Sequence, residues 1–334
     1  MTEAILAEGL CKRFGEVTAL DGVDLRIRPG QVLGLLGPNG SGKTTAVRIL
    51  STLTKPDAGQ ARIYGYDVVR DAARVRQLIA LTGQYAAVDE NLTGTENLVL
   101  MGRLLELNRS QARLRAAELL ETFGLTEAGR RTARTYSGGM RRRLDLAASL
   151  VGRPRVLFLD EPTTGLDPKS RFELWRAVRR LAAEGTSVLL TTQYLEEADQ
   201  LADDLLVINK GRVAASGTAE ALKAQTGGRT LVIRPSDPDK LGTALTAAQA
   251  VAARATEEDS TVVVGSADAA LLSAVLGSLS AAGVEVDEAG LRKPSLDEAF
   301  LAILGETAMP EQDETAGTDQ RTPVAANTSK EHAA

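Results

Sequence analysis

Short apolar runs recur along the first two thirds of the chain, each bounded by glycine or polar residues. Continuous apolar runs of this length are typical of strands buried on both faces, as in parallel sheets. The segments between them are long enough to hold helices. Residues 1–226 are therefore predicted to form an α/β domain with a mainly parallel sheet, whose clearest strands lie at 31–37, 78–82, 156–160, 187–192 and 205–209.

Residues 93–150 show no convincing strand pattern. Apolar positions instead recur at helical spacing over Glu96–Leu107 and again over Ser110–Phe123. This stretch is therefore predicted to be a helical subdomain inserted into the α/β domain.

The pattern changes near Arg229. Helices are predicted at 239–248 and 267–282, and strands at 230–234, 251–256, 261–265 and 284–287. The resulting order, β-α-β-β-α-β, is that of the ferredoxin-like plan. We therefore expect a small α+β accessory domain over residues 229–304, ending in a further helix at 295–304.

Three other segments bear on how the protein could reach a membrane and where its fold ends. The most apolar long stretch, Ala267–Val284, is interrupted by polar residues, and its large side chains recur at helical spacing, which predicts one buried face rather than a membrane span. Residues 305–334 have almost no large apolar side chain and are predicted to be a disordered tail. The first residues lack the basic and apolar pattern of a signal peptide. We therefore expect the protein to reach a membrane only through a partner.

Composition and charge exclude further kinds of site and argue against one class of binding partner. The net charge is −5 and the isoelectric point is about 5.3, which argues against nucleic-acid binding, because that needs clustered Lys and Arg. Cys11 is the single cysteine, so an internal disulfide and a cysteine-based zinc site are excluded and a reduced, cytosolic setting is expected.

A phosphate-binding motif joins the first apolar run to the helix that should follow it. Glycines let backbone N–H groups surround a β-phosphate, and the start of a helix adds a favourable dipole. Lys43 is expected to reach the β- and γ-phosphates of ATP, and the Thr44 hydroxyl to bind Mg²⁺. The motif fits G-x-x-x-x-G-K-[ST] with Gly37, Pro38, Asn39, Gly40, Ser41, Gly42, Lys43, Thr44 and Thr45.

The apolar run at 156–160 ends in two carboxylates, Asp160 and Glu161. Ligands bind at the carboxyl ends of strands in such sheets. Asp160 is expected to hold Mg²⁺, directly or through water, and Glu161 to orient or deprotonate the attacking water. Together with the phosphate-binding loop, these residues predict a P-loop NTPase, a class that includes kinases, GTPases and helicases.

The segment that begins Tyr136, Ser137, Gly138, Gly139 resembles the signature motif of the ABC family, which lies shortly before the acidic strand. The resemblance implies an ABC cassette that forms a head-to-tail homodimer on ATP. Ser137 and the N–H groups of Gly138 and Gly139 would then grip the γ-phosphate bound by the other chain. The adjacent Arg141–Arg143 are expected to form the solvated face of this helix.

The same resemblance assigns three further residues. Phe14 matches the aromatic that stacks on adenine, although a core aromatic at a strand end is the alternative reading. Gln84 matches the Q-loop glutamine that contacts Mg²⁺ and water and senses the membrane subunit. Asp167 matches the D-loop aspartate that couples the two active sites.

One position departs from the family pattern. The family places a histidine after the strand at 187–192, but Gln193 stands here, and the single histidine is His332 in the tail. Glutamine can donate an amide hydrogen bond to phosphate but carries no proton that titrates near neutral pH. Glu161 is therefore the main candidate for the general base, and Gln193 is the second candidate catalytic residue.

Three strings, at 83–98, 191–203 and 294–300, resemble the ATP-binding subunits of daunorubicin/doxorubicin resistance exporters, and the likeness extends over about residues 3–304. It implies a peripheral ATPase on the cytoplasmic face of the cell membrane that uses ATP and Mg²⁺. Separate permease subunits would contact the drug, an anthracycline-like molecule. Lipid, polysaccharide or peptide cargo is the alternative, and a soluble ABC ATPase or an ATP-gated regulatory module is a more remote one.

Overall fold

The computed structural model describes residues 3–83, 88–225, 229–258 and 260–305. The strands are β1 Ile5–Phe14, β2 Val17–Ile27, β3 Val32–Leu36, β4 Ala58–Ile63, β5 Tyr66–Asp67, β6 Ile79–Thr82, β7 Val156–Asp160, β8 Ser187–Thr191, β9 Asp204–Asn209, β10 Arg212–Gly217, β11 Arg229–Pro235, β12 Thr256–Glu258, β13 Thr261–Ala267 and β14 Val286–Arg292. The α-helices are α1 Lys43–Leu50, α2 Ala72–Leu78, α3 Gly94–Leu104, α4 Arg109–Thr122, α5 Gly138–Ser149, α6 Pro168–Ala183, α7 Leu195–Leu201, α8 Ala219–Gln225, α9 Leu241–Gln249, α10 Ala269–Ala281 and α11 Leu296–Leu304.

The central sheet of the cassette has the order β10-β9-β3-β8-β7-β6. Its inner pairs are parallel, and β10 joins the edge antiparallel to β9. Every residue of β3, β7 and β8 is buried, which explains why these strands read as continuous apolar runs. The prediction of a mainly parallel sheet is confirmed.

A second sheet, β2-β1-β4-β5, is antiparallel and was not predicted. The pairing of β1 with β2 shifts register at three places, so the alternation of apolar and polar residues that identifies such strands is broken. Its inner face packs against β3 and α1 in one core that includes Ile5, Leu25, Leu35 and Ile49.

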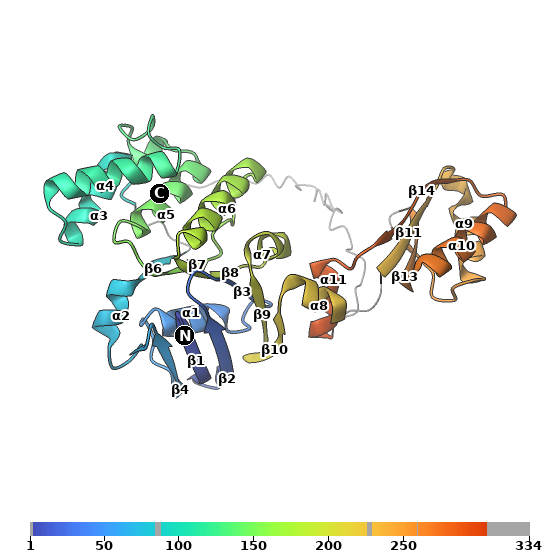
Figure 1. Cartoon of the computed structure of the whole chain (residues 1–334), viewed down its shortest axis with the longest axis horizontal. Coiled ribbons are helices and arrows are strands. Elements are labelled where there is room, and N and C mark those ends of the chain that lie inside the picture. Colours follow the sequence, from blue (N-terminus) through green and yellow to red (C-terminus); the bar gives the residue numbers. More distant parts are fainter. Residues whose placement is uncertain (1–2, 84–87, 226–228, 259, 306–334) are drawn as a thin grey trace, which may run out of the picture.

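Helices α3, α4 and α5 form a lobe of their own (Figure 1), as the sequence predicted. Capping boxes fix the first turns of two of these helices, with Thr93 and Glu96 on α3 and Asn108 and Gln111 on α4. The lobe shares a core with the adjacent face of the central sheet, where Leu98, Leu119, Leu157 and Leu190 are among the buried residues.

The accessory domain carries a third sheet, ordered β12-β13-β11-β14 with all neighbours antiparallel. Helices α9 and α10 pack against it, and their shared core includes Leu231, Val264 and Leu279. The ferredoxin-like plan is confirmed. One predicted strand, 251–256, is wrong over most of its length, because the N–H groups of Val251 and Ala252 bond back to Ala248 at the end of α9.

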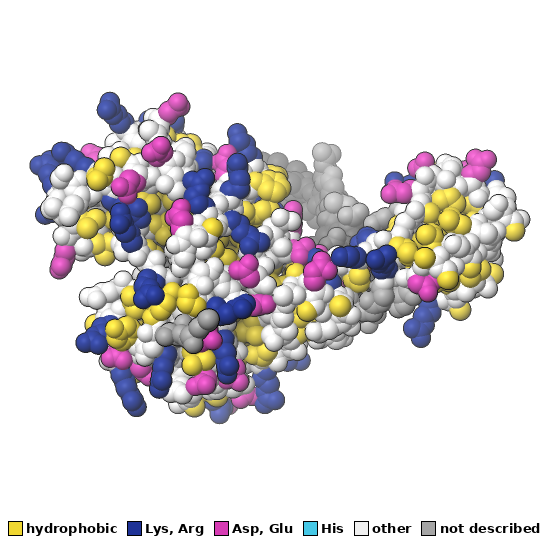
Figure 2. Space-filling model, viewed as in Figure 1, with side chains coloured by type: hydrophobic (Ala, Val, Ile, Leu, Met, Phe, Trp, Pro, Cys, Tyr) yellow, Lys and Arg dark blue, Asp and Glu magenta, His cyan; other side chains and the backbone are white. Residues whose placement is uncertain are grey.

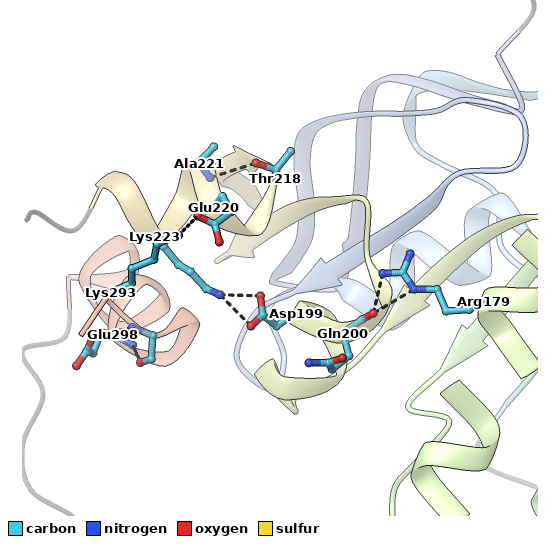
Figure 3. A network of polar contacts seen from close by, with 10 residues as sticks. Arg179, Asp199, Gln200, Thr218, Glu220, Ala221, Lys223, Lys293 and Glu298 are labelled. Carbon is cyan, nitrogen blue, oxygen red and sulfur yellow. Dashed lines mark hydrogen bonds and ion pairs between the residues drawn. The ribbon is translucent and has the colours of Figure 1, made fainter. Parts of the chain in front are cut away.

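The last described helix, α11, packs against a different domain from the one expected. The sequence placed it in the accessory domain, whereas its buried residues Leu296 and Ala299 pack in a cluster with Leu36, Leu205 and Leu222 of the cassette. Ion pairs lie beside this contact (Figure 3), with Lys223 of α8 2.7 Å from Asp199 of α7 and Lys293 3.4 Å from Glu220. Helices α8 and α11 thus lie between the cassette and the third sheet (Figure 1).

Within the described ranges, none of the helices combines the length and the apolar character that a membrane span requires.

Candidate functional site

The phosphate-binding motif forms a tight loop between β3 and α1. Gly37 and Gly42 have φ angles of 155° and 113°, which residues with a side chain rarely adopt. A Cβ atom at either position would also collide with backbone, at the carbonyl oxygens of Ile208 and Ala19 respectively. The loop therefore keeps its N–H groups close to one another and near the start of α1, the arrangement that binds phosphate.

Lys43 spans this loop. Its side chain is buried, and its Nζ donates to the carbonyl oxygens of Gly37 (2.6 Å) and Pro38 (3.0 Å). Burial lowers the pKa of Lys43, and the charges of Glu161 and Asp160 partly offset that effect. The ammonium group is thus held beside the loop and near both carboxylates.

The acidic pair lies at the end of β7. A carboxylate oxygen of Asp160 accepts a hydrogen bond from the Thr191 hydroxyl on β8. The next residue, Glu161, turns with a positive φ of 48°, and its N–H donates to Thr191 O at 3.0 Å. Its carboxylate accepts a longer bond from the Thr164 hydroxyl, at 3.4 Å. The backbone at Glu161 is therefore strained but fixed by the neighbouring strand.

Gln193 follows β8 and lies next to the phosphate-binding loop. It is exposed and lines a cleft of about 240 Å³ together with Leu36, Gly37, Pro38, Asn39, Thr192, Leu195 and Phe300. The structure therefore brings Gln193, Lys43 and the acidic pair to the same end of the central sheet.

The signature residues lie in the helical lobe. Ser137 caps α5 by accepting a hydrogen bond from the Met140 N–H (3.3 Å). The first N–H groups of this twelve-residue helix therefore lie beside Ser137. Asp167 caps α6 in a similar way, and its bonds to the N–H and hydroxyl of Ser170 lower the pKa of its carboxyl. Ser170 in turn fits so closely against Gly139 that a Cβ there would overlap it. Signature and D-loop residues are thus neighbours.

The remaining predicted residues have mixed outcomes. Phe14, at the end of β1, is 52% exposed, with Lys12 Nζ 5.5 Å from the ring centroid, so the reading of Phe14 as a core aromatic is wrong. Thr44 is exposed and Thr45 half-buried at the start of α1. Gln84 lies outside the described residues.

The expectation that Arg141–Arg143 form a solvated face is wrong for Arg143, whose side chain is 16% exposed and pairs with Glu173 at 2.9 Å. It is also wrong for Arg142, where the difference matters for the site. The Arg142 side chain is only 13% exposed and donates to backbone carbonyls beside the acidic pair. Helical spacing could have predicted the burial of Arg142, because it lies three residues from both Gly139 and Asp145, which are buried on α5.

A larger cleft of about 680 Å³ separates the helical lobe from α2 and β6, and Figure 2 shows the hollow at the left edge of the molecule. Its lining is mostly apolar and includes Leu81, Met101, Leu105 and Leu114. Two of these residues are conspicuously open to solvent, Leu105 at 48% and Leu114 at 65% exposure. The cleft therefore presents exposed leucines beside an apolar lining.

Comparison with known proteins gives a consistent picture. A sequence profile of the family described as ABC transporter matches residues 20–164. The chain is 53% identical to the daunorubicin resistance ATP-binding protein DrrA3 of Streptomyces coeruleorubidus, over 91% of this chain and 96% of that one. It is 49% identical to the daunorubicin/doxorubicin resistance ATP-binding protein DrrA of Streptomyces peucetius, over 96% and 98%. A solved ATP-binding subunit of an ABC transporter superposes with a TM-score of 0.60 at 26% identity, covering 66% of this chain and 92% of that one.

Proposed function

This chain belongs to the ABC transporter family, and within it to the daunorubicin/doxorubicin resistance ATP-binding proteins, and from that premise we propose that it powers the export of an anthracycline-like drug. The chain is an ATPase subunit. The observation that carries the proposed cargo is the likeness of about half of all residues to drug-resistance subunits along nearly their whole length, accessory domain included.

For ATP binding, we assign the β- and γ-phosphates to the loop from Gly37 to Gly42 and to Lys43. The backbone fits, because Gly37 and Gly42 have no Cβ at the two places where one would collide with neighbouring carbonyl oxygens. The Thr44 hydroxyl and the Asp160 carboxylate are oxygen ligands of the kind that Mg²⁺ prefers, with Gln84 as a further ligand. Bound Mg²⁺ would neutralise charge on the phosphate oxygens.

For hydrolysis, we assign to Glu161 the role of orienting and deprotonating water. The Glu161 N–H donates to Thr191 O, so the backbone that carries the carboxylate has a defined position at the end of β7. Gln193, in the cleft beside Gly37 and Asn39, would donate its amide to the γ-phosphate. No titration near neutral pH is expected from this position.

The two groups of phosphate-binding residues belong to different lobes of the chain, because the phosphate-binding loop precedes α1 whereas Ser137, Gly138 and Gly139 begin α5 (Figure 1). We therefore propose a head-to-tail homodimer in which each ATP lies between the phosphate-binding loop of one chain and the α5 N-terminus of the other. Asp167, which is linked to Gly139 through Ser170, would lie at the same interface, and Phe14 would stack on adenine.

The 680 Å³ cleft is proposed as the docking site for a membrane permease subunit. Its apolar floor and exposed leucines suit the apolar face of a short permease helix. The cleft adjoins β6, which leads directly toward Gln84, so docking and the nucleotide site would share this segment. The chain would then lie on the cytoplasmic face of the membrane, and the permease would contact the drug.

The first test compares wild type with Glu161→Gln by size-exclusion chromatography with MgATP. We expect the variant to lose at least about 100-fold in ATPase rate and to remain a stable ATP-bound dimer. The double variant Glu161→Gln/Lys43→Ala is the matched control and should stay monomeric. Absence of an ATP dimer together with unchanged hydrolysis would contradict both the assignment of Glu161 and the dimer.

The cargo needs a separate measurement. In cells that hold the chain with its membrane subunit, doxorubicin efflux should depend on the chain and should be abolished by Lys43→Ala. If hydrolysis is intact but doxorubicin efflux does not respond, the exporter carries another cargo.

A further inference from the structure

Arg142 joins three parts of the nucleotide site within one chain. It projects from α5, the helix that begins with the signature residues. Its Nη1 donates to Gly83 O at 2.6 Å, and its Nε donates to Pro162 O at 2.8 Å. Longer contacts of 3.5 Å reach the carbonyl oxygens of Asp160 and Glu161. The guanidinium thus bridges the end of β6, the end of β7 and α5.

The residues it bridges adjoin those proposed to act on ATP. Gly83 immediately precedes Gln84, and Pro162 immediately follows Glu161. Arg142 binds backbone oxygens rather than the carboxylates of Asp160 and Glu161, so its contacts fix the position of the chain without engaging these two side chains.

The surroundings of Arg142 hold it in place. Its side chain is 13% exposed and that of Asp145, 3.5 Å away on the next turn of α5, is 3% exposed. Burial lowers the pKa of Arg142, and the charges of Asp145, Glu197 and Asp160 oppose that effect. A buried charge is costly unless it is paired and hydrogen-bonded, so this guanidinium has little freedom to move away from its partners.

We propose that Arg142 is a positioning residue that fixes Gly83, at the end of β6, and the Glu161–Pro162 segment of its own chain relative to the signature helix. The planar guanidinium is suited to this role, because its several N–H groups point in fixed directions toward separate acceptors. The coupling of the two sites rests on the proposed head-to-tail homodimer. A shift of α5 as it grips the partner's nucleotide would move the catalytic segments of its own chain, and thereby link the two sites.

Arg142→Lys is the decisive variant, because it keeps the charge near Asp145 while losing the fork that spans Gly83 and Pro162. Arg142→Gln removes the charge as well. Arg141→Gln is the matched control, since Arg141 lies on the same helix and pairs with Glu90 at 2.7 Å, away from these carbonyls. Each is measured for kcat, KM for ATP and melting temperature in the full chain.

We expect Arg142→Lys to lower kcat by about 10- to 100-fold, because small misplacements of catalytic groups cost rates of this order. KM for ATP should stay within about twofold, because Lys43 and its loop are untouched. In a Glu161→Gln background, Arg142→Lys should still form the ATP dimer. Arg141→Gln should keep kcat within about twofold of wild type.

Wild-type kcat in Arg142→Lys would overturn the inference, as would a loss of ATP binding that matches the loss of kcat. Either result would leave the proposed function standing, because that function is tested by the wild type and Glu161→Gln alone. If Arg142→Gln fails to fold, Arg142→Lys still decides the question.

Discussion

Glu197 is a buried carboxylate on α7, outside the residues proposed to act on ATP. It has no exposed surface, and it accepts a hydrogen bond from Trp175 Nε1 at 3.1 Å. Burial raises the pKa of Glu197 above the value of 4.5 that applies in an unfolded chain, against hydrogen bonds from its neighbours and the charge of Arg171. The folded state therefore holds this proton more tightly than the unfolded state.

Stability should fall with rising pH because of this group. Below pH 4.5 both states are protonated and the contribution is fully present. As the pH rises from there through the folded pKa, it is lost at about 1.4 kcal/mol for each pH unit of that window. Glu197→Gln keeps the neutral form, so its stability relative to wild type should be greater at pH 7.5 than at pH 5, measured by urea unfolding.

The exposed neighbour Glu196 supplies the control. Glu196→Gln should change stability by a similar amount at both pH values. A Glu197→Gln effect that is equally independent of pH would show that burial does not control this carboxyl.

Residues whose role depends on local sequence were the ones that could be predicted. Gly37, Gly42 and Lys43 lie in one short loop, so their proximity follows from the local sequence, and the apolar run before Asp160 marks its strand end. Arg142 could not be placed in the same way, because its partners Gly83 and Pro162 are 59 and 20 residues distant in sequence. Only the folded chain brings them together.

Among the elements, α11 shows how far pattern reading extends. Its existence and its start were predictable, since Ser295 and Glu298 form a capping box with two reciprocal bonds. Its packing partner was not, because an apolar face does not specify which of two nearby cores it covers. The same limit applies to β1 and β2, whose register shifts hide the strand period.

The packing of α11 can be tested with a pair of leucines of equal chemistry. Leu296 of α11 is 4% exposed in the cluster shared with the cassette, and Leu279 of α10 is fully buried in the accessory core. Leu→Ala at such sites costs about 2–5 kcal/mol. We expect Leu296→Ala to lower the unfolding midpoint of the cassette and Leu279→Ala to lower that of the accessory domain. If Leu296→Ala instead lowered the unfolding midpoint of the accessory domain, α11 would not pack in the cassette as described.

At the scale of the whole molecule, the cores are separate. The accessory sheet and its two helices bury their own apolar side chains, whereas the helical lobe and the central sheet share one cluster. Chains with independent cores do not unfold in a single two-state step. The fold class followed from the sequence, and the accessory core could be recognised because its buried residues lie within one contiguous segment, from Leu231 to Val284.

Calorimetry of the full chain should therefore resolve two transitions. At the proposed site MgATP would bind the folded cassette alone, so at about 100 times its dissociation constant it should stabilise that transition by about 2.7 kcal/mol and leave the other in place. Lys43→Ala is the control and should remove the shift. One transition that moves as a unit with MgATP would mean that the accessory domain does not unfold independently.

Because α11 is the last helix in the described part of the chain, the ribosome completes the cassette before it synthesises the helix that packs on it. Helix α8 ends at Gln225 and α11 ends at Leu304, 79 residues later. At about 5–20 residues per second, the ribosome needs roughly 4–16 s for that interval. During it, the part of the Leu36, Leu205 and Leu222 cluster that α11 later covers has no α11 to pack against. A nascent chain that stalls or is cut in the accessory domain therefore keeps an adhesive apolar surface, which makes such fragments targets for chaperones and proteases.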